Sequence, residues 1–189
     1  GGDAPLGGAA DYASSAPLRG KKGSEYEGGV RVPFIAAWAK PDAKNKFQKK
    51  YPIAQNAVQL QQGTVMDLYP TILSVAHVKP PKHYALDGAD LKKLFQGKED
   101  KKHRDDFLMH FPHGEHRANY FPTYRKGDWK LIYYYHPETT GIPTWKLYNL
   151  KDDPYEKTEV SAEYPEKTAS MIEQMKDRLK EENALYPEE

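Results

Sequence analysis

The spacing of hydrophobic and polar positions changes part-way along the chain. From residue 106 onward it is typical of strands, and four are predicted, at 107–111, 119–124, 129–135 and 145–150. A hairpin turn containing Gly127 joins the middle two. Residues 165–184 then carry apolar side chains at helical spacing, namely Ile172, Met175 and Leu179. This half of the chain is therefore predicted to be a four-stranded antiparallel sheet covered by a C-terminal helix.

The first half is organised differently. Residues 32–39 form an apolar run, which we expect to be a strand buried on both faces within a parallel sheet. Residues 67–78 are predicted to form a helix with Asp67 as its N-cap. Its expected buried face consists of Leu68, Ile72, Val75 and Ala76. A shorter helix is expected at 90–95, ended by a glycine at position 97.

A run of charges at 98–106 is expected to be a solvated linker, and it marks the candidate boundary between two domains. The first domain, residues 1–100, would contain a glycine-rich loop, the buried strand and the helices of an α/β fold. The second, residues 101–189, would be the antiparallel-sheet subdomain with its terminal helix. The predicted fold class is thus α/β followed by α+β.

Composition narrows the range of partners only slightly. The 189 residues carry a formal net charge of +1, so nothing favours nucleic acid or an anionic membrane. No apolar run is long enough to span a bilayer. The absence of cysteine excludes disulfides and thiol chemistry in this chain. Fourteen tyrosines favour sheet surfaces and a polar aromatic cleft.

The most distinctive segment is residues 17–33, PLRGKKGSEYEGGVRVP, in which two adjacent lysines stand among four glycines. Glycine permits positive φ and close backbone approach, so such a loop can hold an ammonium group against an anion. Composition alone also allows a solvated surface loop, since charged glycine-rich loops are common.

This segment resembles the loop that follows the last metal ligands in the sulfatase family, whose members share the alkaline-phosphatase-like fold. Agreement in type and spacing extends to twelve positions: Pro17, Leu18, Arg19, Gly20, Lys22, Gly23, Glu27, Gly28, Gly29, Arg31, Val32 and Pro33. In that family the lysine corresponding to Lys22 binds a sulfate oxygen. The resemblance therefore implies that Lys22 is a catalytic and substrate-binding residue, whose compact charge would stabilise a transferring sulfuryl group.

Weaker matches to the same family lie at 67–91 and 123–156. They imply that residues 1–100 are the C-terminal remnant of a catalytic α/β domain and that residues 101–189 are the subdomain that ends the fold. The resemblance then implies that the last metal ligands, an Asp followed by Asn or His, and the nucleophile lie upstream of Gly1. The resemblance implies that Ca²⁺ orients the sulfate, a formylglycine hydrate attacks sulfur, and an upstream histidine protonates the leaving oxygen.

Ser15 begins a short match to the motif from which formylglycine is made, Cys/Ser-x-Pro-x-Arg. We interpret the match as coincidental, because the Leu-x-Thr-Gly continuation is absent. The fragment alone is therefore expected to be inactive.

A second cluster of chemically active residues is the run from His110 through His113 to His116 and Arg117. Histidines three apart on a helix could bind zinc, but the proline and glycine within the run argue against a helix. An ordinary polar loop at the end of a strand is one interpretation. The other, suggested by the resemblance, is that His113, His116 and Arg117 bind a sugar substrate.

Glu25 and Glu27 could be paired carboxylates for acid–base chemistry, but we expect Glu27 to order the loop through charge-assisted hydrogen bonds. The resemblance implies that the complete protein hydrolyses a sulfate ester of a carbohydrate, with a sulfated small molecule or glycan as its partner. It also implies export to the periplasm or to the outside of the cell. Two alternatives remain. One is a phosphoric or phosphonic ester hydrolase of the same superfamily, and the other is a non-catalytic glycan-binding module.

Overall fold

The computed structural model describes residues 14–113, 121–136, 141 and 143–187. The chain separates into two compact units. In one, the described residues up to Pro33 group with those from Asp106 onward, and the other is Phe34–Asp105. The expected boundary near residue 100 therefore lies close to one observed junction. Residues 14–33, however, belong with the sheet and not with the helical segment.

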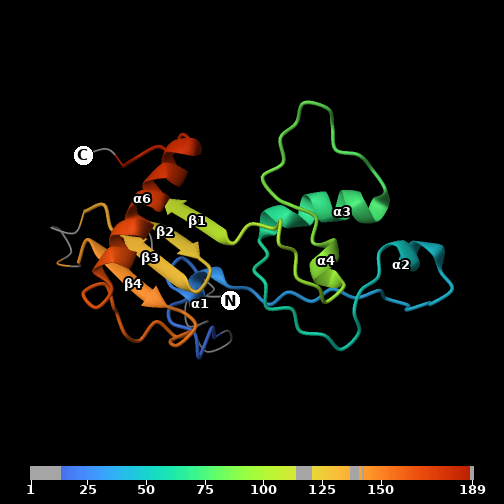
Figure 1. Ribbon diagram of the computed structural model, residues 1–189, viewed down its shortest axis with the longest axis horizontal. Helices are drawn as coiled ribbons and strands as arrows, with labels where there is room; N and C mark the ends of the chain where they lie inside the picture. The colour runs from blue at the N-terminus through green and yellow to red at the C-terminus, as the bar shows by residue number, and fades with distance from the viewer. Residues whose placement is uncertain (1–13, 114–120, 137–140, 142, 188–189) are drawn as a thin grey trace, which may run out of the picture. The chain divides into compact units, whose positions relative to one another are not determined.

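The first unit is built on a four-stranded sheet whose spatial order follows the chain, β1-β2-β3-β4 (Figure 1). Its strands are β1 Asp106–Phe111, β2 Phe121–Lys126, β3 Trp129–Tyr133 and β4 Trp145–Asn149. Neighbouring strands are antiparallel throughout, so the predicted sheet is confirmed. Gly127 has a φ of +55° in the tight turn between β2 and β3, a conformation that glycine adopts without steric cost.

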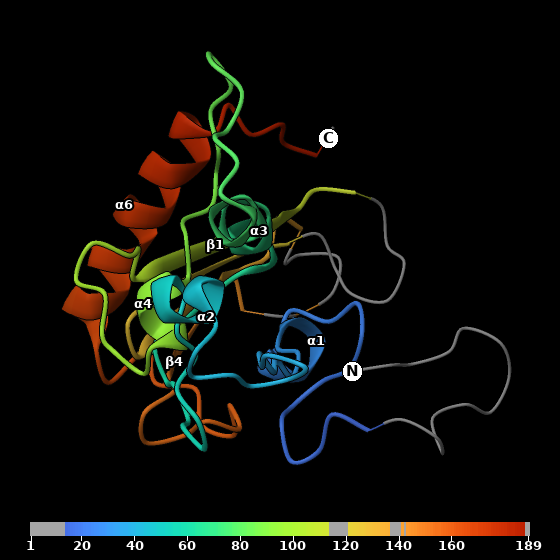
Figure 2. The ribbon, with the colours of Figure 1, turned by 90° about the vertical axis from the view of Figure 1, so that its right-hand side faces the viewer.

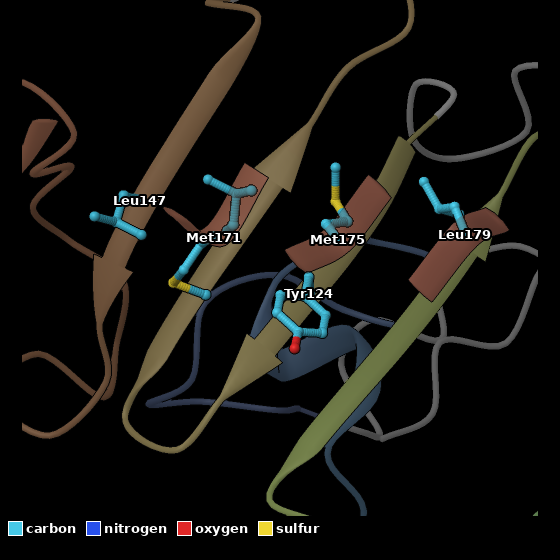
Figure 3. Close-up of a cluster of buried hydrophobic side chains, with 6 residues drawn as sticks. Tyr124, Leu147, Met171, Met175 and Leu179 are labelled. Atoms are coloured by element: carbon cyan, nitrogen blue, oxygen red, sulfur yellow. The ribbon is translucent and has the colours of Figure 1, made fainter. Parts of the chain in front are cut away.

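Helix α6, Pro165–Glu181, covers one face of this sheet, as Figure 2 shows. Its proline occupies the first turn, where the missing N–H is not needed. The helix turns its apolar side chains toward the strands (Figure 3). The resulting core consists of Tyr124, Leu131, Leu147, Met171, Met175 and Leu179. Two of the three residues expected on the helix's apolar face, Met175 and Leu179, are fully buried there, and Ile172 is partly buried against them.

The opposite face of the sheet carries the glycine-rich loop and the short helix α1, Glu27–Val30. A second hydrophobic cluster lies on this side, made of Phe121, Ile132, Tyr134, Tyr148 and Leu150. Tyr26 from the loop packs against this cluster and meets Tyr148 edge-on at 6.2 Å between ring centroids. The sheet therefore has two covered faces, one beneath α6 and one beneath the loop.

The second unit contains α2 Lys46–Lys50, η2 Val65–Asp67, α3 Leu68–Ala76 and α4 Lys92–Phe95. Helix α2 lies in a polar segment between Pro41 and Pro52. The Asn45 side chain explains it, because it accepts hydrogen bonds from the first free N–H groups of the helix. The buried hydrophobic residues of this unit are Tyr51, Leu91 and Leu94.

Asp67 does not cap α3 in the expected way. Its buried carboxylate accepts hydrogen bonds from the backbone N–H of Thr64, at 2.7 Å, and of Ala89, at 2.8 Å. It therefore closes the preceding turn η2 and ties it to a distant loop. The expected apolar face of the helix is only partly covered: Leu68 and Val75 are half-buried, whereas Ile72 is 62% exposed. The fully buried residue of α3 is Thr71.

The strand predicted at 32–39 is not formed. This segment has no regular structure, and Val32 and Ile35 are 71% and 90% exposed. A strand exists only when a neighbouring strand accepts its backbone hydrogen bonds, and among the described residues no strand pairs with it. The predictions of a strand and of burial are therefore both wrong for this segment in the described structure.

Candidate active site

Lys22 lies at the tip of the glycine-rich loop, in a turn between Gly20 and Gly23, whose φ values are +80° and +91°. Both values fall in the left-handed region, which explains why glycine occupies these positions. The Lys22 residue is exposed. Within the part of the chain that the structure describes, its side chain forms no hydrogen bond or ion pair. Its ammonium group is therefore available to an anion.

The base of the loop is closed by direct backbone contact. The Gly28 N–H donates to the carbonyl oxygen of Arg19 at 2.7 Å, and the Ser15 hydroxyl donates to the carbonyl oxygen of Gly28 at 2.8 Å. A Cβ on Gly28 would lie 2.5 Å from the carbonyl oxygens of both Arg19 and Gly20. The two ends of the loop thus meet at a point where only glycine fits. Ser15 has a structural contact here, which agrees with its match to the nucleophile motif being coincidental.

Glu27 points into the protein and not toward Lys22. Its Oε1 lies 3.0 Å from Lys130 Nζ, and its Oε2 accepts a hydrogen bond from Arg125 Nη1 at 3.3 Å. Glu25 is also engaged, because its Oε1 accepts a hydrogen bond from the Tyr134 hydroxyl at 2.6 Å. Neither carboxylate is free for acid–base chemistry. The expectation that Glu27 orders the loop through charge-assisted hydrogen bonds is confirmed.

Two residues of the sheet unit complete this arrangement, and neither was predicted from the sequence to have a role in it. Lys130 lies in the middle of β3 and is 1% exposed, while Glu156, in the connection from β4 to α6, is 0% exposed. Their side chains meet at 2.8 Å. Both lie within the stretch at 123–156 that resembles the family, and this resemblance was the one sign in the sequence that they matter. Their shared partner in the loop, Glu27, lies more than a hundred positions away in the chain.

Burial and charge act in opposite directions on these groups. Burial raises the pKa of Glu156, and the neighbouring Lys130 ammonium partly offsets that rise. The pKa of the Tyr134 hydroxyl is also raised, first by burial and then by the Glu25 carboxylate beside it. Tyr134 therefore stays protonated and acts as a hydrogen-bond donor.

The predicted histidine cluster is only partly described. His113 is exposed just beyond the end of β1, where its ring meets Phe111 edge-on at 5.5 Å between centroids. His116 and Arg117 lie outside the described residues, so their proposed role in binding remains a prediction. His110 has a different environment: its Nε2 is 2.7 Å from the Tyr135 hydroxyl, and burial lowers its pKa.

The described residues contain no group of three or more histidine, aspartate or glutamate side chains placed to hold a metal ion. Among the described residues, Lys22 and His113 form no hydrogen bond or ion pair with each other. What this chain offers is a single exposed cation on a braced loop. Such a group can stabilise negative charge on a bound oxyanion, but it cannot by itself supply a nucleophile or bind a metal.

Sequence comparison identifies the family to which this loop belongs. The family described as N-sulphoglucosamine sulphohydrolase, C-terminal, matches residues 21–184. The chain belongs to the sulfatase family. A sulfatase of Formosa agariphila is 33% identical over 183 residues, which cover 88% of this chain and 29% of the relative.

Solved structures agree with this assignment. The crystal structure of Ps i-CgsB superposes with a TM-score of 0.62 at 26% identity, covering 86% of this chain and 32% of the other. A second structure, of a protein in complex with its substrate D-glucosamine-2-N,6-O-disulfate, gives a TM-score of 0.56 at 26% identity, covering 68% of this chain and 26% of the other. The chain thus spans about a third or less of the length of these relatives.

The expected sulfatase fold, with its antiparallel sheet and C-terminal helix, is confirmed by these comparisons. Among the described residues, no helix combines the length and the apolar character needed to cross a membrane.

Proposed function

We propose that the complete protein is a sulfatase that hydrolyses a sulfate ester of a carbohydrate, and that this chain supplies Lys22 as the cation that contacts a sulfate oxygen. The observation that carries the proposal is the loop itself. It is closed by the contact between Gly28 and Arg19, its inward carboxylate Glu27 is held by the sheet, and its tip presents an ammonium without a partner in the described chain.

The chemistry expected of Lys22 is electrostatic. As a sulfate ester is cleaved, negative charge develops on the transferring group and on the leaving oxygen. A fixed ammonium close to a non-bridging sulfate oxygen stabilises that charge without taking part in proton transfer. Lysine suits this role because its charge is compact, and a braced loop lowers the cost of holding it in place.

The remaining groups would come from outside this chain. When present, Ca²⁺ would hold the sulfate and a formylglycine would supply the nucleophile. The described residues fit neither group, because they contain no cluster suited to a metal and Ser15 is engaged with a backbone carbonyl. We therefore assign to this chain only the positioning of its own cation and the recognition of substrate.

Two of the similarities support a carbohydrate substrate, one to a protein family and one to a solved structure. The matching family is described as N-sulphoglucosamine sulphohydrolase, and one of the similar structures contains a disulfated glucosamine as its substrate. In this chain His113, His116 and Arg117 are the proposed sugar-binding residues. Truncation of His113 and His116 in the complete protein should raise KM for the natural substrate, and an unchanged KM would remove them from the site.

The test is an assay of the complete protein on three substrate sets: sulfated monosaccharides, an aryl sulfate, and matching phosphate and phosphonate esters. Hydrolysis of the sulfate esters in preference to the others is the expected result. Preference for phosphate or phosphonate esters would instead favour an ester hydrolase of the same superfamily. Binding of sulfated sugars without hydrolysis would favour a glycan-binding module. The fragment assayed alone should be inactive.

A further inference from the structure

A buried ion cluster lies directly beneath the loop that carries Lys22. At its centre is the Lys130 ammonium, 3.0 Å from Glu27 Oε1 and 2.8 Å from Glu156 Oε1. All three side chains are at most 3% exposed. Arg125 extends the cluster from the neighbouring strand and lies 3.3 Å from the second oxygen of Glu27. The more exposed Arg31 lies 3.8 Å from the same oxygen. Two carboxylates therefore face three cations, so the negative charge in the cluster is fully compensated.

Glu156 is the residue at which both ends of the loop are attached. Its Oε2 accepts a hydrogen bond from the backbone N–H of Glu27 at 2.6 Å. Its backbone carbonyl oxygen accepts a hydrogen bond from Arg19 Nη1 at 2.7 Å. The Arg19 guanidinium also lies 3.9 Å from the centre of the Tyr26 ring. Lys22 stands between these two points of attachment, so its position follows from that of Glu156.

The energetics favour a positioning role over a purely stabilising one. Burying charged groups carries a desolvation cost, and well-packed apolar side chains in the same space are often as stable or more so. What an ion cluster adds is direction, since each hydrogen bond fixes an angle as well as a distance. Glu156 itself has a φ of +54°, an uncommon conformation for a residue with a side chain. The surrounding contacts hold it in this conformation.

We propose that Glu156 is a positioning residue for Lys22, so that the antiparallel sheet sets the location of the catalytic cation through the cluster of Glu156, Lys130 and Glu27. The inference rests on the proposed function, because it assumes that Lys22 contacts the sulfate. It gives the antiparallel sheet a role in catalysis, because the sheet holds the loop that carries Lys22 in a fixed position.

The test is a double-mutant cycle in the complete enzyme, with kcat/KM for a sulfate ester as the readout. Glu156→Gln keeps a side-chain acceptor but removes the charge, and it should lower kcat/KM on the order of 10- to 100-fold, as expected for a misplaced catalytic group. In a Lys22→Ala background the same change should have almost no further effect, because the group it positions is already gone.

Glu159→Gln is the matched control. Glu159 lies in the same connection and accepts hydrogen bonds from the backbone N–H groups of Leu147 and Ser161. Among the described residues it forms no hydrogen bond or ion pair with the loop. Its effect on kcat/KM should be small and the same with or without Lys22. This separates a positioning role from a general loss of local stability.

If Glu156→Gln does not fold, Arg19→Gln replaces it in the cycle, because Arg19 is exposed. This change removes the second attachment to Glu156, together with the contacts of Arg19 with Tyr26 and Tyr148. Loss of activity that multiplies with that of Lys22→Ala would overturn the inference while leaving the proposed function intact. If Lys22→Ala alone leaves sulfate hydrolysis unchanged, the proposed role of Lys22 fails, and this inference fails with it.

Discussion

Gly28→Ala should disrupt the base of the loop, where its two ends meet. The new Cβ would lie 2.5 Å from the carbonyl oxygens of Arg19 and Gly20 and 3.0 Å from the carbonyl carbon of Arg19. All three neighbours are backbone atoms, so no side chain can rotate away to relieve the contact. The backbone on one side or the other must move.

The size of the effect can be worked from these distances. Carbon and oxygen atoms tolerate an approach of about 3.3 Å, so the two backbone segments that meet at Gly28 must separate by about 0.8 Å. That shift would lengthen the 2.7 Å hydrogen bond from the Gly28 N–H to Arg19 to about 3.5 Å, the limit of a hydrogen bond. Overpacking of this kind costs about 1–3 kcal/mol, and the weakened hydrogen bond adds about 0.5–1.5 kcal/mol.

Two measurements check this prediction: the free energy of unfolding in denaturant, and kcat/KM for a sulfate ester in the complete protein. Gly63→Ala is the control, because its Cβ would meet nothing closer than a Leu91 methyl at 3.4 Å. The control should change stability by no more than about 0.5 kcal/mol. A Gly28→Ala protein that matches the control in both measurements would refute the view that the loop is closed at this point.

Three further predictions concern the sheet unit. Met175→Ala empties a fully buried site beneath α6 and should cost about 2–5 kcal/mol in denaturant unfolding, whereas Lys176→Ala on the exposed side should cost almost nothing; equal losses would contradict the packing. Tyr134→Phe removes the donor to the buried Glu25 carboxylate and should cost about 1–3 kcal/mol, and an unchanged unfolding midpoint would argue against that bond. Burial, and to a lesser extent the charge of a neighbouring histidine, lowers the pKa of His110 below its ordinary 6.5, so the unfolded chain takes up the proton first as the pH falls. The stability that His110 contributes is therefore complete above pH 6.5 and is lost as the pH falls through its lowered pKa in the folded protein. His110→Gln should reduce the dependence of the free energy of unfolding on pH in this range. An unchanged dependence would show that other groups cause it.

The sheet and α6 could be predicted because their signals are local. Alternating side chains, the Gly127 turn and the helical spacing of Met175 and Leu179 each act within a few residues. The errors lie mostly at element ends: β3 stops at Tyr133, and α6 stops at Glu181. Strand and helix ends depend on which backbone groups find partners, and spacing carries little information about that.

The strand prediction for residues 32–39 was wrong for a different reason. Its composition indicates burial, but a strand also needs a neighbour with a free edge, and the strand order in the described residues provides none beside it. Residues 67–78 show a related limit. The carboxylate of Asp67 was recognised as a capping group, but its hydrogen bond from Ala89 depends on a loop more than twenty positions away.

The candidate site divides in the same way. Lys22 could be selected because the family motif surrounds it on both sides within one short stretch. The cluster beneath it could not, because Lys130 and Glu156 meet Glu27 only once the sheet has folded. Lys130 alternates along its strand with Trp129 and Leu131, so its side chain lies on the opposite face of the sheet from theirs. The sequence only weakly indicates that this face is also buried. The structure shows which carboxylates lie on it.

The most direct test of the account is the effect of Lys22→Ala on kcat/KM for a sulfate ester in the complete protein, compared with Lys21→Ala. Both variants remove one lysine from the same turn, so they change net charge and loop composition equally. The account predicts a loss of roughly 100-fold or more for Lys22→Ala, as for removal of one electrostatic group from an oxyanion site, and a small change for Lys21→Ala. Equal effects of the two variants, or full activity without Lys22, would contradict it.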